Sequence, residues 1–404
     1  MKTAVSNTSV VRRRLLLRDS LTVLALCSVA AVLFGITSFL FTSFERHRED
    51  LAKTWSDRGK KNLQESQPAA AVYCLRAALT YAPGNGAYQL LLATALADAG
   101  RTDEAINYFL NMWAGSPGDG FINLQLARLM RRKGYAQQSI EYYRSSIYGN
   151  WQGDGTVRRR EIRLELAQYL IDQHNLPAAR VELLIVAGNA PLDDPHLDVT
   201  LAEMLQSADD RADAWVYFKK AIASDPKDLT ALEKGGYVAY DLGEYGAAHS
   251  LFTRAVQQDG SASDSAAKRQ ELTAMEQTTR RLLELDLSGA MSRKEFAEHI
   301  ALDSQIAEAR MNSCSAQLAG TGGVPPVIQN LQSRWKALVP GTGRRKVSAP
   351  TSEDQDSVVE LIYDTESQTE QVCGPPTGDD ALLALLGSKP DAAQHASQSS
   401  LEKP

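Results

Sequence analysis

The stretch that decides the fold is residues 86–119, which read GAYQLLLATALADAGRTDEAINYFLNMWAGSPGD. A small residue at Ala93, a glycine at Gly100 and an aromatic residue at Phe109 mark this stretch, and Pro117 closes it. The glycine recurs 34 residues later at Gly134, and Pro117 itself stands 34 residues after another proline. Self-similarity at a period of this length is typical of repeated supersecondary units that stack on one another.

The same residue types return in six blocks between residues 52 and 262. The blocks cover residues 52–85, 86–119, 120–153, 160–194, 195–228 and 229–262. The third block has Trp151 in the place of the closing proline, and the sixth has no closing proline. The phase slips by six residues after the third block, where Asp154 and the glycines beside it predict a loop insertion. Such a loop is either part of a binding surface or a tolerated surface feature.

The six blocks resemble the tetratricopeptide repeat (TPR), a helix–turn–helix unit. The resemblance covers roughly half of the chain and implies an all-α solenoid of about six repeats over residues 45–262, in which small residues of helix A face large residues of helix B. The small residues are Ala93, Ala127, Ala167 and Ala202, and the large ones are Leu75, Phe109, Tyr143, Leu183, Phe218 and Phe252. Gly100, Gly134 and Gly243 fit the tight turn after helix A, where glycine adopts a positive φ at little cost.

The amino terminus carries an apolar run, Leu21 to Phe44, of 24 residues without a charge. As a helix it spans about 36 Å, enough to cross a hydrocarbon core of about 30 Å. The residues before it are basic and are opposed only by Asp19: Lys2, Arg12, Arg13, Arg14 and Arg18. We therefore expect a cytoplasmic tail at 1–19, a transmembrane segment at 20–44 and the rest of the chain outside the cytoplasm.

Two other kinds of amino-terminal segment fit less well. A cleaved signal peptide would end in a small-x-small site, and the run ends in Thr42-Ser43-Phe44 instead. A lipoprotein signal would need a small residue before its cysteine, and Leu26 precedes Cys27. We therefore predict a retained signal anchor, continued by a charged helix that runs straight into the first repeat.

The region after the repeats divides into a helical capping region at 263–340 and a low-complexity, largely disordered tail at 341–404. Helices are expected at 264–285, 291–318 and 329–338, the second with Ser292 as N-cap and Glu295 in the capping-box position. Within the tail, residues 358–363 fit either a strand or a short helix, and 381–386 form a small apolar island.

Two of the four cysteines lie in this carboxy-terminal region. Cys27 lies in the predicted membrane segment, and Cys74 among apolar residues is expected to fill space in the first repeat. Cys314 and Cys373 are expected either to form a disulfide, since the predicted compartment is oxidising, or to stay free thiols. A disulfide would pin the tail to the helical body.

The sequence contains no recognisable catalytic, metal or cofactor motif. The six histidines are scattered, and no HExxH or CxxC pair occurs. The glycine-rich stretches at 320–323 and 341–343 lack the spacing of a phosphate-binding loop. We therefore predict no metal, no cofactor and no enzymatic activity; the alternative is an enzyme whose site lies after Met291. The net charge of −6 argues against a nucleic-acid partner.

The TPR resemblance implies a concave groove, lined by the faces of the A helices that point away from the B helices. Carried over to this chain, the groove positions are Ser56, Lys60, Leu90, Thr94, Leu124, Arg128, Arg131, Arg132, Leu164, Gln168, Asp172, Val199, Glu203, Glu233, Tyr237 and Tyr240. Among them we single out Arg128, Arg131, Arg132, Gln168 and Tyr237 as peptide-binding residues. The three arginines favour an acidic or C-terminal peptide, because guanidinium groups bind carboxylates in bidentate fashion. The alternative is a solvated basic face.

These expectations combine into a membrane-anchored scaffold that holds protein or peptide partners. The resemblance to bacterial TPR proteins of the inner membrane suggests a periplasmic body that serves envelope assembly or secretion. One alternative is an accessory subunit of an envelope polysaccharide or export system. Another is the reverse topology, with the solenoid in the cytoplasm. The sequence makes no prediction about the partner's identity or the oligomeric state.

Overall fold

The computed structural model describes residues 5–191, 193–259, 266–287, 291–320, 323–338 and 352–388. Over these residues the chain is helical with no strand, and the single β-bridge joins Asp119 to Asn150. The all-α prediction is therefore confirmed. The chain forms two compact units that divide between Leu166 and Ala167, inside one helix, and each unit is described by itself.

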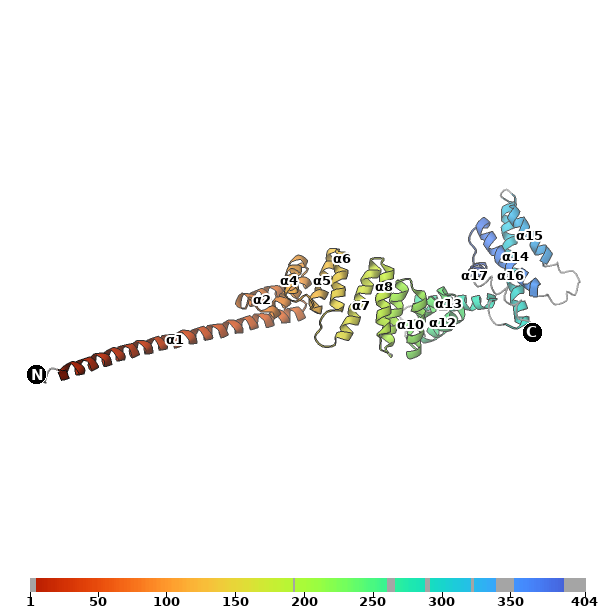
Figure 1. Ribbon diagram of the computed structural model, residues 1–404. Helices are drawn as coiled ribbons and strands as arrows, with labels where there is room; N and C mark the ends of the chain where they lie inside the picture. Colours follow the sequence, from red (N-terminus) through yellow and green to blue (C-terminus); the bar gives the residue numbers. More distant parts are fainter. Residues whose placement is uncertain are drawn as a thin grey trace. The chain divides into compact units, whose positions relative to one another are not determined.

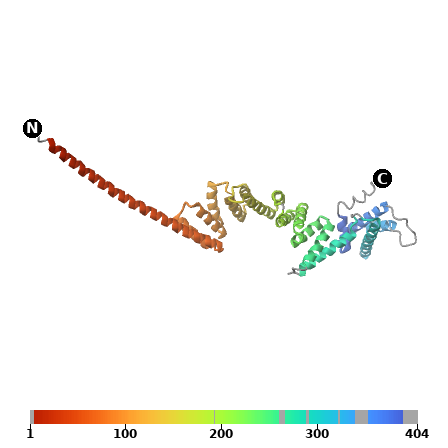
Figure 2. The ribbon, with the colours of Figure 1, turned by 90° about the horizontal axis from the view of Figure 1, so that it is seen from below.

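The first unit begins with an unbroken helix of 60 residues, which Figures 1 and 2 show leading into the first repeat. The helices of this unit are α1 (Val5–Gln64), α2 (Pro68–Tyr81), α3 (Gly86–Asp98), α4 (Thr102–Gly115), α5 (Gly120–Lys133), α6 (Ala136–Ile147) and the first part of α7 (Gly155–Asp172). In the part of the chain that the structure describes, α1 is the one helix long and apolar enough to cross a membrane. The predicted junction, in which the charged helix after Phe44 continues into the first repeat, is confirmed.

The second unit continues the repeats and adds a carboxy-terminal helical bundle. Its helices are the rest of α7, α8 (Leu176–Gly188), α9 (Pro195–Ser207), α10 (Arg211–Ser224), α11 (Leu229–Asp241), α12 (Tyr245–Asp259), α13 (Ala266–Leu285), α14 (Arg293–Ala319), α15 (Pro326–Leu338), α16 (Ser352–Cys373) and α17 (Asp379–Gly387). The repeats follow the predicted order of A and B helices through α12.

The turn between helices A and B has the same backbone conformation in all six repeats. Gly100, Gly134 and Gly243 have φ between 74° and 78°, as predicted. The other three repeats place a non-glycine residue at the same point with φ between 56° and 58°, namely Ser66, His174 and Asp209. A left-handed residue is therefore a requirement of this turn, which short polar side chains tolerate better than β-branched ones.

The packing between helices follows the small-and-large pattern. Every one of the predicted large residues of helix B is fully buried, and so are the four alanines of helix A. Phe109, for example, belongs to a core with Leu92, Leu96 and Leu126. A Cβ atom on Gly236 would lie 2.9 Å from the Phe252 ring, so the glycine makes room for the aromatic residue of its own repeat.

The closing prolines and the insertion also behave as expected. α2, α4, α8 and α10 each end two or three residues before Pro83, Pro117, Pro191 and Pro226. After α6 the indole of Trp151 takes the place of a proline and donates a hydrogen bond of 2.9 Å to the Ser146 carbonyl oxygen. The insertion around Trp151 is a loop, and α7 starts at Gly155.

The carboxy-terminal bundle begins where α13 leaves the repeats. Leu272 near the start of α13 packs with the last repeat, as expected of a cap, whereas Leu282 and Leu285 belong to the bundle core. The predicted helices at 264–285, 291–318 and 329–338 are confirmed to within three residues. Both hydrogen bonds of the capping box between Ser292 and Glu295 are present.

The assignment of 341–404 to a largely disordered tail is corrected over residues 352–388. These residues form α16 and α17 and bury Leu361, Ile362, Leu383 and Leu386 in the bundle core. Residues 358–363 thus belong to a helix. The composition of the region is polar, but its few apolar residues pack against those of α14 and α15. Local composition does not show this contact. Residues 339–351 and 389–404 lie outside the described residues.

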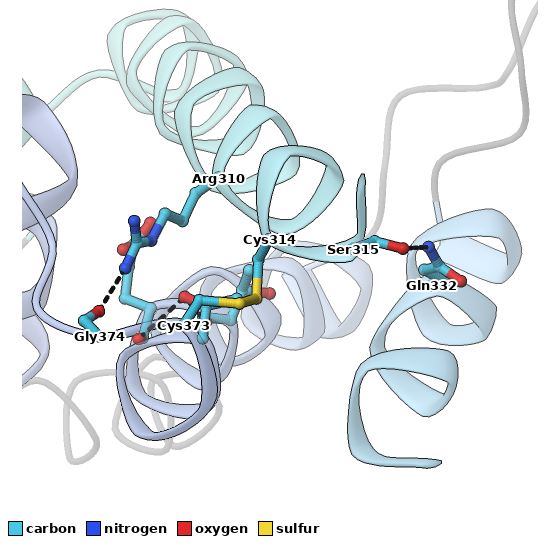
Figure 3. The surroundings of a disulfide bond; sticks show 9 residues. Arg310, Cys314, Ser315, Gln332, Cys373 and Gly374 are labelled. Atoms are coloured by element: carbon cyan, nitrogen blue, oxygen red, sulfur yellow. Dashed lines mark hydrogen bonds between the residues drawn. A yellow bond between two sulfur atoms is a disulfide. The ribbon is translucent and has the colours of Figure 1, made fainter. Parts of the chain in front are cut away.

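A disulfide joins Cys314 of α14 to Cys373 at the end of α16, with 5.7 Å between their Cα atoms (Figure 3). Close to it, Arg310 donates a hydrogen bond of 2.6 Å to the Gly374 carbonyl oxygen, and Gln332 of α15 donates one to Ser315. These contacts join α14 to α15 and to the end of α16. Cys27 and Cys74 are free.

Candidate protein-binding groove

The basic part of the predicted groove lies in the first unit, on α5. Arg128 donates two hydrogen bonds to the Glu165 carboxylate, of 2.8 Å to Oε1 and 2.6 Å to Oε2. Tyr143 adds a third, of 2.7 Å from its hydroxyl to the same Oε1. This bidentate pair has the geometry in which arginine recognises a carboxylate. The chain therefore supplies its own carboxylate at the place predicted for a ligand's.

Electrostatics at this cluster follow from the same contacts. The hydrogen bond to Glu165 raises the pKa of Arg128. Burial by itself would raise the pKa of the Glu165 carboxyl, but the hydrogen bonds from Arg128 and Tyr143 outweigh it and hold that pKa below its usual value. Burial, followed by the bond to Glu165, raises the pKa of Tyr143, while Arg131 opposes that rise. Arg131 thus belongs to the same cluster, and Glu165 is ionised at neutral pH.

The third arginine of the predicted cluster points elsewhere. Arg132 donates a hydrogen bond of 2.7 Å to the Ala97 carbonyl oxygen at the end of α3. A cation at this position stabilises the free carbonyl groups of a helix C-terminus. Two other predicted groove positions, Ser56 and Leu124, are buried and do not line a surface. The TPR resemblance placed these two residues in the groove, and that prediction is wrong for both, because each side chain packs between helices.

The second unit contains a hollow of about 380 Å³ on the A-helix side of the fifth and sixth repeats. It is lined by residues of α9 and α11: Glu203, Gln206, Ser207, Glu233, Lys234 and Tyr237. Three of these, Glu203, Glu233 and Tyr237, were predicted groove residues, and the structure brings them together. The hollow offers carboxylates, an ammonium group, an amide and an aromatic ring within one surface.

Pairs of polar groups cross this surface from one A helix to the next. Lys234 lies 2.7 Å from Glu203, and Lys268 of α13 lies 2.6 Å from Glu233. The Tyr237 hydroxyl donates a hydrogen bond of 2.6 Å to Glu271, and its pKa is raised by burial and by this bond. The Tyr237 ring packs edge-on against Phe252, 5.1 Å between centroids, which fixes its direction.

A common sequence spacing relates four of these polar pairs: Arg128–Glu165, Glu203–Lys234, Glu233–Lys268 and Tyr237–Glu271. The members of each pair are 31 to 37 residues apart, about one repeat, and they join one A helix to the next or, for the last two pairs, α11 to α13, the helix after the last repeat. The sequence positions of the groove residues, taken one at a time, do not show these partners. A search for complementary polar residues one period apart would have found them.

The last of the predicted groove residues, Gln168, belongs to the second unit. Its amide donates a hydrogen bond of 2.9 Å to Asp172, one turn later on α7. Its contact with a peptide stays a prediction. Among the described residues no group of three or more His, Cys, Asp or Glu side chains could hold a metal ion.

Comparison with known families identifies the repeats. Residues 62–113, which contain the end of the first helix pair and most of the second, match the tetratricopeptide repeat family. This part of the chain is therefore identified as tetratricopeptide repeat. The match falls on α2, α3 and α4, and the same order of helices and the same turn conformation recur as far as α12. No curated protein sequence matches the chain.

Solved structures similar to this chain share little sequence with it. The carboxy-terminal part of a TPR repeat-containing protein from Cytophaga hutchinsonii is 12% identical, with a TM-score of 0.45 over 56% of this chain and 85% of its own. PilW, described as a type IV pilus biogenesis factor, is 20% identical, with a TM-score of 0.39 over 55% and 98%. PilF of Pseudomonas aeruginosa is 14% identical, with a TM-score of 0.39 over 56% and 99%.

Proposed function

We propose that this TPR protein is a membrane-anchored scaffold that holds a partner protein in its A-helix groove. The observation that carries the proposal is the groove surface of α9 and α11, where opposite charges and a fixed aromatic ring line a hollow of about 380 Å³. Aromatic residues and groups with both hydrogen-bond donors and acceptors are what protein interfaces use for affinity and register. TPR stacks expose such a surface because each A helix contacts only its neighbours.

The anchor in this proposal is the apolar part of α1. Its side chains from Leu21 to Phe44 are exposed, with Phe34 at 75% and Phe41 at 66%. A row of large exposed apolar side chains on a helix long enough to span a bilayer fits lipid as its surroundings. The basic residues before it favour a cytoplasmic amino terminus and a body in the bacterial periplasm, where the disulfide between Cys314 and Cys373 would persist.

Topology is tested by reporter fusions after Pro404. A reporter that works only outside the cytoplasm should be active, and a cytoplasmic reporter at the same position should be silent. The opposite pattern would put the solenoid in the cytoplasm and end the periplasmic proposal.

Binding in the groove is tested by photo-crosslinking in native membranes. A crosslinking amino acid at Gln206, in the hollow, should capture a discrete partner. The matched control is Val216, which is 51% exposed on helix B of the same repeat. Equal capture at the two positions, or capture only at Val216, would move the binding surface away from the groove.

The arginine cluster suggests an acidic segment as the ligand of the first unit. In this proposal a ligand carboxylate replaces Glu165 on Arg128, with Arg131 beside it. Glu165→Gln should then strengthen the binding of a synthetic peptide with an acidic C-terminus, and Arg128→Gln should weaken it. Both variants break the same internal ion pair, so a purely structural role would change binding in the same direction in both.

A further inference from the structure

The apolar part of α1 and helix A of the first repeat are one continuous helix. Nothing in residues 5–64 ends the helix, since the stretch contains no proline. The apolar side chains end at Phe44, and contact with the body begins at once: Glu45 and Arg48 are half-buried, and Ala52 is 1% exposed. The solenoid is therefore joined to the apolar segment without a linker.

The contact at Arg48 fixes where α2 ends along α1. Arg48 donates hydrogen bonds of 3.2 Å from Nε and 2.8 Å from Nη2 to the Tyr81 carbonyl oxygen, the last residue of α2. Its other amino group pairs with Glu45 at 2.9 Å. Further along, Gly59 of α1 packs against Leu75, so α2 runs antiparallel to α1. The carboxy-terminal end of α2 thus points back toward the apolar segment, as Figure 1 shows.

Helix geometry converts these contacts into a height above the apolar segment. Arg48 is four residues after Phe44, which places it about 6 Å further along the axis. The polar headgroup layer on each side of a bilayer is about 5 to 8 Å thick. The turn that follows Tyr81, residues 82–85, leaves α2 at this level. Tyr81 is an aromatic residue with a polar tip, the kind enriched at the boundary between lipid and water.

We infer that the turn at residues 82–85, together with the end of α2, rests in the headgroup layer of the membrane that holds α1. The inference rests on the proposed anchor and adds a second contact with the same membrane. One helix fixes only the attachment of the body, whereas a helix and a lateral contact also fix its tilt. The first repeat then presents the groove in a set direction relative to the bilayer.

The two ends of the first helix pair provide a matched test. Gly84, in the near turn, is exposed, and a Cβ atom there would meet nothing within 4 Å. Glu65, in the turn at the far end, is also exposed and lies about 32 Å past Phe44 by helix rise. Each is changed to cysteine, Gly84→Cys or Glu65→Cys, in the full chain with Cys27→Ala and Cys74→Ala, and labelled with a small fluorophore.

The labelled proteins are reconstituted in vesicles whose lipids carry bromine near the headgroup end of the acyl chains, because bromine quenches nearby fluorophores. A loss of fluorescence at position 84, and none at 65, supports the inference. A flexible Gly-Ser linker inserted between Phe44 and Glu45 should abolish the loss at 84. If position 84 shows no more loss of fluorescence than position 65, in protein that stays with the vesicles after a high-salt and alkaline wash, the inference is overturned and the anchor is left intact. Release of the protein by that wash would overturn both.

Discussion

The repeat stack and the carboxy-terminal bundle are both helical, but they are held together differently. In the stack, residues that touch lie within about one repeat of each other, as Phe109 does with Leu92 and Leu126. In the bundle, the disulfide spans 59 residues, and the pair between Arg281 and Asp379 spans 98. Contacts between neighbouring repeats recur at the sequence period and can be predicted from it, whereas each long-range contact of the bundle occurs once.

The two regions also differ in the partners of the buried carboxyl groups compared here. The most deeply buried carboxylate that the structure describes in the stack, Asp198, has Lys220 at 2.9 Å. The bundle buries Asp303 and Glu366 completely, and neither carboxyl group has a hydrogen-bond partner among the described residues. An unpaired buried charge is costly, so such groups are kept neutral instead. The stability of the bundle should therefore fall as the pH rises and these carboxyl groups ionise.

The largest expected effect is a loss of bundle stability as the pH rises from about 4 to about 8. Burial raises the pKa of Asp303 to about 8; Arg281 opposes this and Asp286 adds to it. Burial also raises the pKa of Glu366 to about 8, with Asp380 adding to the rise and Arg310 opposing it. Below about pH 4 both carboxyl groups are protonated in the folded and in the unfolded state. Above that pH the unfolded chain ionises first, so each group lowers the free energy of unfolding by up to about 1.4 kcal/mol per pH unit.

Hydrogen exchange of α14 and α16, corrected for the intrinsic effect of pH, measures this loss. Asp303→Asn and Glu366→Gln should flatten the pH profile between pH 5 and 8. In this window Asp379, whose pKa is lowered by Arg281, is ionised in both states and contributes no slope. The control is Glu298→Gln on the exposed side of α14, which should leave the profile unchanged. A profile equally steep in α9 to α12 would remove the contrast between the two regions.

The second effect concerns the stack. Phe109→Ala should lower the local free energy of opening in α3 to α5 by about 4 kcal/mol, because it removes a fully buried aromatic side chain and leaves a cavity. Hydrogen exchange of the full chain should show the loss in neighbouring repeats and none in α14 to α16. The control Tyr73→Ala, 69% exposed on α2, should cost far less.

The third effect isolates the long-range link of the bundle. Cys314→Ser with Cys373→Ser should lower the stability of α14 and α16 by about 3 kcal/mol, since the open chain gains conformational entropy in the unfolded state. A reductant should have the same effect on the wild type and none on the double variant. Undiminished protection of α16 after reduction would show that apolar packing alone holds the bundle.

The smallest effect tests the fit within one repeat. Gly236→Ala should destabilise α11 and α12 by about 1 kcal/mol, because its Cβ would crowd the Phe252 ring more than the gain in helix propensity repays. Gly246→Ala, at an exposed position of α12 with nothing within 4 Å, should be neutral or slightly stabilising. The unfolding temperature should fall for Gly236→Ala and should not fall for Gly246→Ala, and a stabilised Gly236→Ala would contradict the close packing.

The sequence by itself determined the parts of this protein that depend on neighbours along the chain. The period identified the repeats, the glycines and prolines marked the turns, and the uncharged run located the apolar segment of α1. Only the tertiary structure showed that Arg128 pairs with Glu165 and that Arg132 donates a hydrogen bond to the Ala97 carbonyl oxygen. It also showed that residues 352–388 fold as α16 and α17. A period records contacts that recur at one spacing, whereas the partner of a single charge or of a polar helix is chosen by three-dimensional packing, which local composition does not contain.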